Sequence, residues 1–131
     1  MTEIIEKDLS YQIVEAAYEV FNFLGPGFLE NIYEEAMVIG LTHHRHEVER
    51  QKVVFIHFQG QQIGFDKLDL VIDNKVVLEL KAVAEIAPIH KQQALSYLKA
   101  IGLELALVMN FGAHRLQAAR VVNTKRKDRP A

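Results

Sequence analysis

The residues most suited to chemistry are an acid and a base two positions apart in an otherwise apolar stretch. Glu79 and Lys81 interrupt residues 76–83, whose remaining side chains are all apolar. Side chains alternate across a β-strand, so Glu79 and Lys81 would share one face while Leu78 and Leu80 occupy the other. An acid and a base are costly to bury unless they are paired or bind a ligand. This pattern therefore predicts a functional site.

A second acid, Asp69, lies in the preceding apolar stretch. If residues 73–75 form a three-residue turn, Ile72 pairs with Val76. Asp69 then lies directly opposite Glu79 on the same face, whereas a two-residue turn would place it opposite a leucine. The hydrophobic pattern favours the three-residue turn, because the other register would move apolar side chains to the wrong face.

Two carboxylates on paired strand positions are about 5 Å apart at Cβ and repel each other. Such a pair indicates a shared proton or a hard divalent cation. The chain contains no cysteine, and oxygen ligands favour Mg²⁺ or Mn²⁺ over zinc. Lys81 beside the ion could stabilise an attacking hydroxide or a phosphorane-like transition state. The alternative is an ordinary Glu–Lys pair on a solvated face, with Asp69 uninvolved.

The composition is that of one globular domain. The chain has 131 residues, of which 50% are hydrophobic and 24% charged, with a net charge of −2. This balance excludes a histone-like polycation, and the lack of cysteine excludes disulfides and thiolate zinc sites. We expect a single domain over residues 1–124 and a basic, flexible tail over 125–131. Neither a signal peptide nor a membrane span is recognisable, so we expect a cytoplasmic protein without membrane contact.

Hydrophobic periodicity predicts the elements that must position these residues. The order is α-α-β-β-β-α-β-β, and the first three strands form an antiparallel meander. We expect helices over 9–24, from 28 to about 41, and over 88–101, and strands over 53–58, 63–72, 76–83, 105–109 and 116–122.

Two motifs carry a resemblance to known proteins. Asp69 followed by Glu79-Leu80-Lys81 resembles the D…(D/E)xK signature of the PD-(D/E)XK nuclease superfamily. The segment Gly25–Tyr33 resembles the G-x-x-E-x-x-Y element of the GxxExxY family within that superfamily. The likeness extends from about residue 9 to residue 122, through Val48–Gln51, Leu78–Val83, His90–Lys99 and Asn110–Gly112. Leu68 replaces the proline of the signature.

The resemblance implies an α/β fold with a restriction-endonuclease-like core (α-β-β-β-α-β), in which a central mixed sheet is flanked by helices. It also implies that Asp69, Glu79 and the Leu80 carbonyl hold Mg²⁺ or Mn²⁺ and that Lys81 orients or activates the attacking water. Glu30 matches the additional helical acid of the superfamily, which can bind a second metal ion or its water.

On the helix over 88–101, Gln93 matches the glutamine of the superfamily's Q-x-x-x-Y-L motif, which lies near the site. His90, Gln93 and Tyr97 share one helical face and could contact a phosphate or a base.

The implied function is a Mg²⁺-dependent nuclease that hydrolyses phosphodiester bonds through a metal-activated water. The implied substrate is nucleic acid, with DNA favoured over RNA, and cutting both strands of a duplex is compatible with a homodimer. Phosphate binding would require clustered basic residues, with Lys67, Lys81, Lys91, Lys99, Arg115, Arg120 and the tail as candidates. The alternative is a non-catalytic binding or regulatory module that retains the fold.

Overall fold

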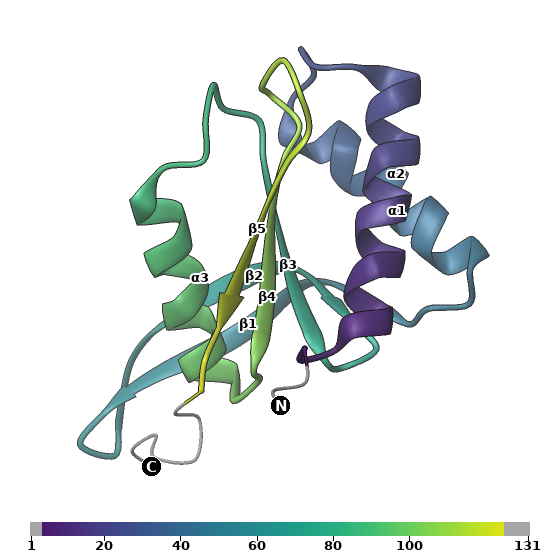
Figure 1. Ribbon diagram of the computed structural model, residues 1–131. Coiled ribbons are helices and arrows are strands. Elements are labelled where there is room, and N and C mark those ends of the chain that lie inside the picture. Colours follow the sequence, from purple (N-terminus) through teal and green to yellow (C-terminus); the bar gives the residue numbers. More distant parts are fainter. Residues whose placement is uncertain (1–3, 125–131) are drawn as a thin grey trace.

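The computed structural model describes residues 4–124, so the predicted basic tail at 125–131 lies outside the described residues. The sheet is mixed and has the order β1-β2-β3-β4-β5, in which only β3 and β4 are parallel. Helices α1 and α2 cover one face of the sheet and α3 covers the other (Figure 1). The elements are α1 (Lys7–Leu24), α2 (Glu30–His43), β1 (Val48–Phe58), β2 (Gln61–Ile72), β3 (Val76–Lys81), α3 (Pro88–Ile101), β4 (Leu105–Asn110) and β5 (Gln117–Val122).

The predicted order of elements is confirmed, and α3 has the predicted bounds. Several predicted ends differ from the structure, the largest difference being that β1 begins at Val48 rather than at Val53. Two of the other differences have identifiable reasons. Helix α2 begins at Glu30 rather than at Phe28, because the buried Tyr33 hydroxyl accepts the backbone N–H of Phe28 at 3.2 Å. Strand β3 ends at Lys81 rather than at Val83, because the side chain of Asn110 binds both the N–H and the carbonyl of Val83. No described helix is long and apolar enough to cross a membrane.

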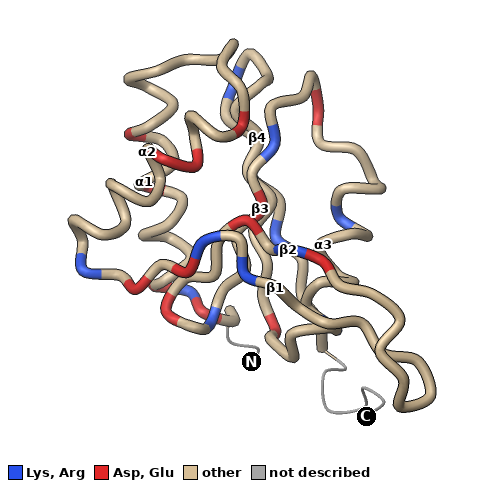
Figure 2. Tube along the Cα trace, turned by 180° about the vertical axis from the view of Figure 1, so that it is seen from behind, with Lys and Arg blue, Asp and Glu red and all other residues tan. Residues whose placement is uncertain are grey.

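The hairpin β1–β2 changes direction partway along its length. Leu70 packs on the α1/α2 side of the sheet, whereas Leu68 packs on the α3 side, although alternate residues of a flat strand share a face. The backbone therefore turns at Asp69. The opposing residue on β1 is Gln51, which has a φ of 49°, an uncommon value for a residue other than glycine. Beyond this bend the hairpin projects from the body, and its outer residues 53–65 contain no Asp, Glu, Lys or Arg (Figure 2).

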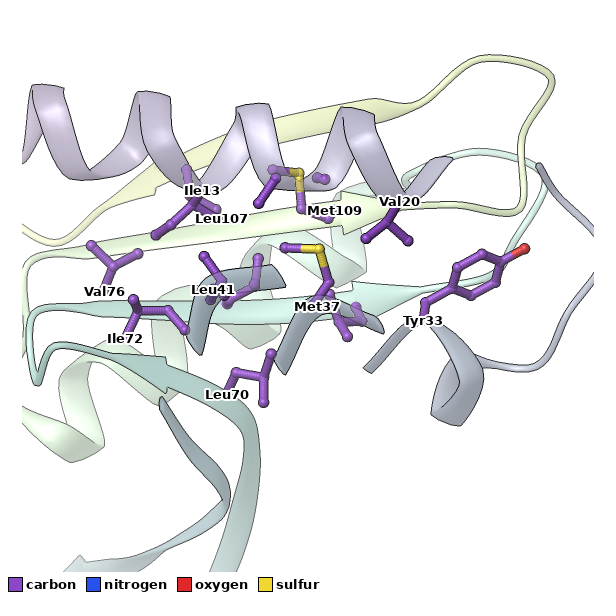
Figure 3. Packing of buried hydrophobic residues seen from close by; sticks show 14 of the residues in the cluster. Ile13, Val20, Tyr33, Met37, Leu41, Leu70, Ile72, Val76, Leu107 and Met109 are labelled. Carbon is purple, nitrogen blue, oxygen red and sulfur yellow. The ribbon is translucent and has the colours of Figure 1, made fainter. Parts of the chain in front are cut away.

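The larger part of the core lies between the sheet and helices α1 and α2. Figure 3 shows Ile13, Met37 and Leu41 meeting the apolar side chains of the central strands. Near the end of this core the ring of Tyr33 stacks on Phe111, with centroids 4.6 Å apart. A second apolar cluster lies beneath α3. Both faces of β3 are thus covered, and this explains why Glu79 is the only charged residue among its buried positions.

Candidate active site

The predicted acidic pair lies where β2 and β3 separate. Ile72 pairs with Val76 and the ladder runs to Leu70 and Leu78, as the three-residue turn requires. At Asp69 and Glu79, the next pair along the two strands, hydrogen bonds between backbone N–H groups and side-chain carboxylates replace the backbone ladder. The Asp69 N–H donates to Glu79 Oε2 at 2.9 Å, and the Leu80 N–H donates to Asp69 Oδ2 at 2.8 Å. The two carboxylates are therefore adjacent, and each is held by the opposite strand.

Burial makes this pair electrostatically unfavourable. Glu79 is 5% exposed, and desolvation together with the neighbouring Asp69 raises its pKa to about 8. Desolvation also raises the pKa of Asp69, although the hydrogen bond from Leu80 opposes the change. The charge of Lys81 lowers the pKa of both acids. A cation placed between the carboxylates would relieve the cost of ionising both of them.

The donor set fits a hard divalent cation. Asp69 Oδ1 and Glu79 Oε1 accept no hydrogen bond from a described residue, and neither oxygen is sealed from solvent. Two carboxylate oxygens at one point suit Mg²⁺ or Mn²⁺. A complete protein cage is not formed, since residues 4–124 contain no group of three acidic or histidine side chains positioned to hold an ion. Mg²⁺ commonly keeps several water ligands, so two carboxylates are a chemically reasonable number.

Lys81 stands at the last position of β3, two residues after Glu79. Its ammonium forms no ion pair with a described acid, yet it lies within Coulombic range of Asp69 and Glu79. The strand end beside it is fixed, because the Phe111 N–H donates to the Lys81 carbonyl at 2.9 Å. The arrangement leaves the ammonium available to a ligand next to the acidic pair.

Helix α2 brings two acids, Glu30 and Glu34, toward this pair, and only Glu30 was predicted from the sequence. Glu30, the predicted helical acid, is exposed at the start of α2 and acts on both carboxylates only through its charge. Glu34, one turn later, raises the pKa of Asp69 more than Glu30 does. Its carboxylate is bound by Arg50 at 3.1 Å and by Gln51 at 2.7 Å. The spacing of four between the two acids was the available signal for Glu34.

The three α3 residues predicted to contact substrate have different surroundings. His90 Nδ1 accepts the N–H of Ala87 at 2.9 Å, so this ring caps the helix. Tyr97 is half-buried, and its pKa is raised by desolvation and then by the charges of Glu79, Asp66 and Asp69. This hydroxyl therefore lies within electrostatic reach of the acidic pair. Gln93 is exposed and forms no hydrogen bond with a described residue.

A buried side chain that the sequence analysis did not identify fixes the backbone after Lys81. Asn110 Oδ1 accepts the N–H groups of Val83 and Gly112, and Asn110 Nδ2 donates to the Val83 carbonyl and to Gln117 Oε1. A Cβ at Gly112 would lie 2.4 Å from the backbone of Ala82 and Val83. Only glycine fits this close approach, and the Asn-Phe-Gly sequence was the signal for a tight turn.

The expected cluster of basic residues is not formed in full. Arg120 donates to Ser10 Oγ at 3.0 Å and to the Ile5 carbonyl at 2.6 Å, so it is held beside α1 on the face away from the acidic pair. Its inclusion in the phosphate-binding set was therefore wrong. The residue was misassigned because strand alternation does not reveal which face of an edge strand meets a helix.

Comparison with known proteins relates this chain to a sequence family and to a solved structure. A model of the PD-(D/E)XK nuclease superfamily matches residues 7–122. The crystal structure of SSO0001 superposes with a TM-score of 0.58 at 17% sequence identity, covering 90% of this chain and 57% of that protein. The present chain thus spans little more than half the length of SSO0001, and the likeness concerns the fold. The sequence matches no curated protein.

Proposed function

The chain belongs to the PD-(D/E)XK nuclease superfamily, and we propose that it is a Mg²⁺- or Mn²⁺-dependent nuclease that hydrolyses phosphodiester bonds, with DNA as the preferred substrate. The observation that carries the proposal is the placement of Asp69 and Glu79 at the separation of β2 and β3, with Lys81 on the same strand as Glu79. The Gly25–Tyr33 segment supports membership of the GxxExxY family.

In this proposal, Asp69, Glu79 and the Leu80 carbonyl hold the ion. The bound cation would supply Lewis acidity and lower the pKa of water for attack on phosphorus. Lys81 orients the attacking water and stabilises negative charge that develops on the phosphate oxygens. Glu30 would serve a second ion or its water, while Gln93 and Tyr97 would contact the substrate.

The experiment compares cleavage of plasmid, single-stranded DNA and RNA with Mg²⁺ or Mn²⁺. Wild type is tested beside Glu79→Gln, Lys81→Ala and the control Glu49→Gln, which removes an exposed acid paired with Lys52 at 2.9 Å. We expect cleavage by wild type and the control, a loss of at least about 10²-fold in Lys81→Ala and a loss of at least about 10³-fold in Glu79→Gln. Equal cleavage by all four proteins would reveal a contaminant and remove the proposal.

A non-catalytic binding module is the second candidate, and the incomplete set of acidic ligands within residues 4–124 is the observation that favours it. Anomalous scattering from crystals soaked in Mn²⁺ distinguishes the two functions. A peak between Asp69 and Glu79 supports the nuclease. Binding of duplex DNA without a peak and without cleavage supports the module.

A further inference from the structure

Glu34 is the carboxylate of α2 that other side chains hold in a fixed orientation. Arg50 Nη2 donates to its Oε2 at 3.1 Å, and Gln51 Nε2 donates to its Oε1 at 2.7 Å. The side chain is only 13% exposed. Carboxylates that serve a metal site are commonly oriented in this way by hydrogen-bond donors around them. Glu34 thus resembles a side chain that is positioned for a ligand.

The residues that hold Glu34 place it on the side of the acidic pair. Gln51 lies opposite Asp69, between two paired positions of β1 and β2, and its amide connects this point of the sheet to Glu34. The charge of Glu34 acts on Asp69, in agreement with this placement. Within residues 4–124, however, no three acidic or histidine side chains are positioned to hold one ion. Glu34 therefore lies beyond direct coordination of an ion between Asp69 and Glu79.

A water molecule on the ion can connect the two. Mg²⁺ prefers six ligands, so an ion held by two carboxylates and one backbone carbonyl keeps about three water molecules. A carboxylate oxygen has two lone pairs, and each oxygen of Glu34 uses one of them for Arg50 or Gln51. The remaining lone pairs can accept hydrogen bonds from water bound to the ion.

We propose that Glu34 is a positioning residue of this site, which accepts a hydrogen bond from a water molecule on the ion bound by the acidic pair. Arg50 and Gln51 keep its carboxylate in the required orientation. The inference rests on the proposed function, because it takes the ion of that site as given. It concerns the binding of the ion and requires no nucleic acid.

The test is a titration of the metal-free protein with Mn²⁺ at one fixed pH, with free Mn²⁺ measured by electron paramagnetic resonance. Glu34→Gln should weaken Mn²⁺ binding at least about 10-fold, the usual effect of removing an orienting partner of a metal site. Glu35→Gln is the matched control. It removes the same charge from the next position and another partner of Arg50, at 2.6 Å, but Glu35 is 59% exposed and lies about 100° further round the helix. Its affinity should stay within about twofold of wild type.

A second variant separates orientation from charge. Gln51→Asn tolerates the positive φ of 49° and leaves the charge of Glu34 in place, but its amide is too short to hold the carboxylate. Its Mn²⁺ affinity should fall about fivefold, the effect of one hydrogen bond. Water proton relaxation by the bound Mn²⁺ should give the same number of coordinated water molecules in wild type and in Glu34→Gln.

The outcomes distinguish this inference from the proposed function. Unchanged affinity in Glu34→Gln, or equal losses in Glu34→Gln and Glu35→Gln, would overturn the role of Glu34 and leave the nuclease proposal standing. One additional coordinated water in Glu34→Gln would make Glu34 a direct ligand and would also overturn the inference. Absence of Mn²⁺ binding by wild type, or binding that survives in Asp69→Asn, would overturn both proposals together.

Discussion

Two aspartates at the two ends of one short segment show how differently this chain uses a carboxylate. Asp73, in the turn after β2, binds His46 Nδ1 at 2.7 Å and the Glu47 N–H at 2.7 Å. Desolvation alone would raise its pKa, but the hydrogen bonds to His46 and Glu47 outweigh that effect and the pKa falls. Asp69 lies beside Glu79, and the pKa of both rises.

The two sites differ in whether the folded state stabilises or destabilises the ionised carboxylate. The turn places its acid beside a partner, so the folded state favours the ionised form of Asp73. The separation of β2 and β3 places an acid beside an acid, so the folded state disfavours the ionised forms of Asp69 and Glu79. A protein retains such a cost where the group serves binding or catalysis. The comparison leads to four predictions, given from the largest effect to the smallest.

Replacing Glu79 should have the largest effect, because it should lower the cleavage activity while raising the stability of the fold. Glu79→Gln removes a ligand and should reduce the single-turnover cleavage rate by at least about 10³-fold, equivalent to about 4 kcal/mol. The same change removes a buried charge, so the free energy of unfolding of the metal-free protein at pH 8 should rise, as measured by urea denaturation. A variant that keeps full activity, or that loses stability at pH 8, would contradict the assignment.

The pH dependence of stability should have opposite signs at the two acids. Glu79 has a pKa of about 8 in the folded protein and 4.5 in the unfolded chain, so the unfolded chain loses its proton first and stability falls as pH rises from 4.5 to 8. The fall should be about 4 kcal/mol in wild type and much smaller in Glu79→Gln, where only the raised pKa of Asp69 contributes. Asp73 stabilises above pH 3.8, and this contribution is lost as pH falls through its lowered pKa. Urea denaturation between pH 3 and pH 8 measures both effects.

Metal addition should stabilise the protein only through the acidic pair. At a Mg²⁺ concentration of about 100 times Kd, the free energy of unfolding should rise by about 2.7 kcal/mol. Thermal unfolding with Mg²⁺ and with EDTA measures this gain. The gain should vanish in Asp69→Asn and persist in Asp73→Asn, which serves as the matched control. Equal stabilisation of the two variants would place the ion elsewhere.

The smallest effect is expected at the turn. Asp73→Asn suits the positive φ of 52° but removes the charge-assisted contact with His46. Unfolding should become easier by about 1 kcal/mol, with cleavage unchanged. Chemical denaturation and the plasmid assay provide the two measurements. Loss of cleavage in this variant would show that the turn and the acidic pair are not independent.

The sequence predicted the acidic pair because the pair depends on local information. Alternation and the length of one turn determine the register of Asp69 and Glu79, and the structure has that register. Tyr33 is different, because its position near the start of a helix does not by itself predict that the ring is buried. It is fully buried and donates to the Gly25 carbonyl at 2.6 Å. Its environment is created by Phe111, which is distant in the sequence and cannot be read from local periodicity.

The bend in the hairpin was also beyond sequence reasoning. Gln51 has no intrinsic preference for a positive φ, and its conformation arises where the hairpin leaves one face of the sheet for the other. The binding of Glu34 by Arg50 and Gln51 depends on the same tertiary arrangement. Side chains that connect distant elements are therefore the part of the candidate site that only the structure reveals.

The reciprocal bonds between the carboxylates and the opposite strands have a kinetic consequence. One oxygen of Asp69 and one of Glu79 are anchored to backbone N–H groups, so the rotamers of both side chains are fixed when the hairpin forms. An arriving ion meets ligands whose conformational entropy has already been lost during folding. Association should then proceed without a slow rearrangement, at a rate governed by the exchange of water on the ion.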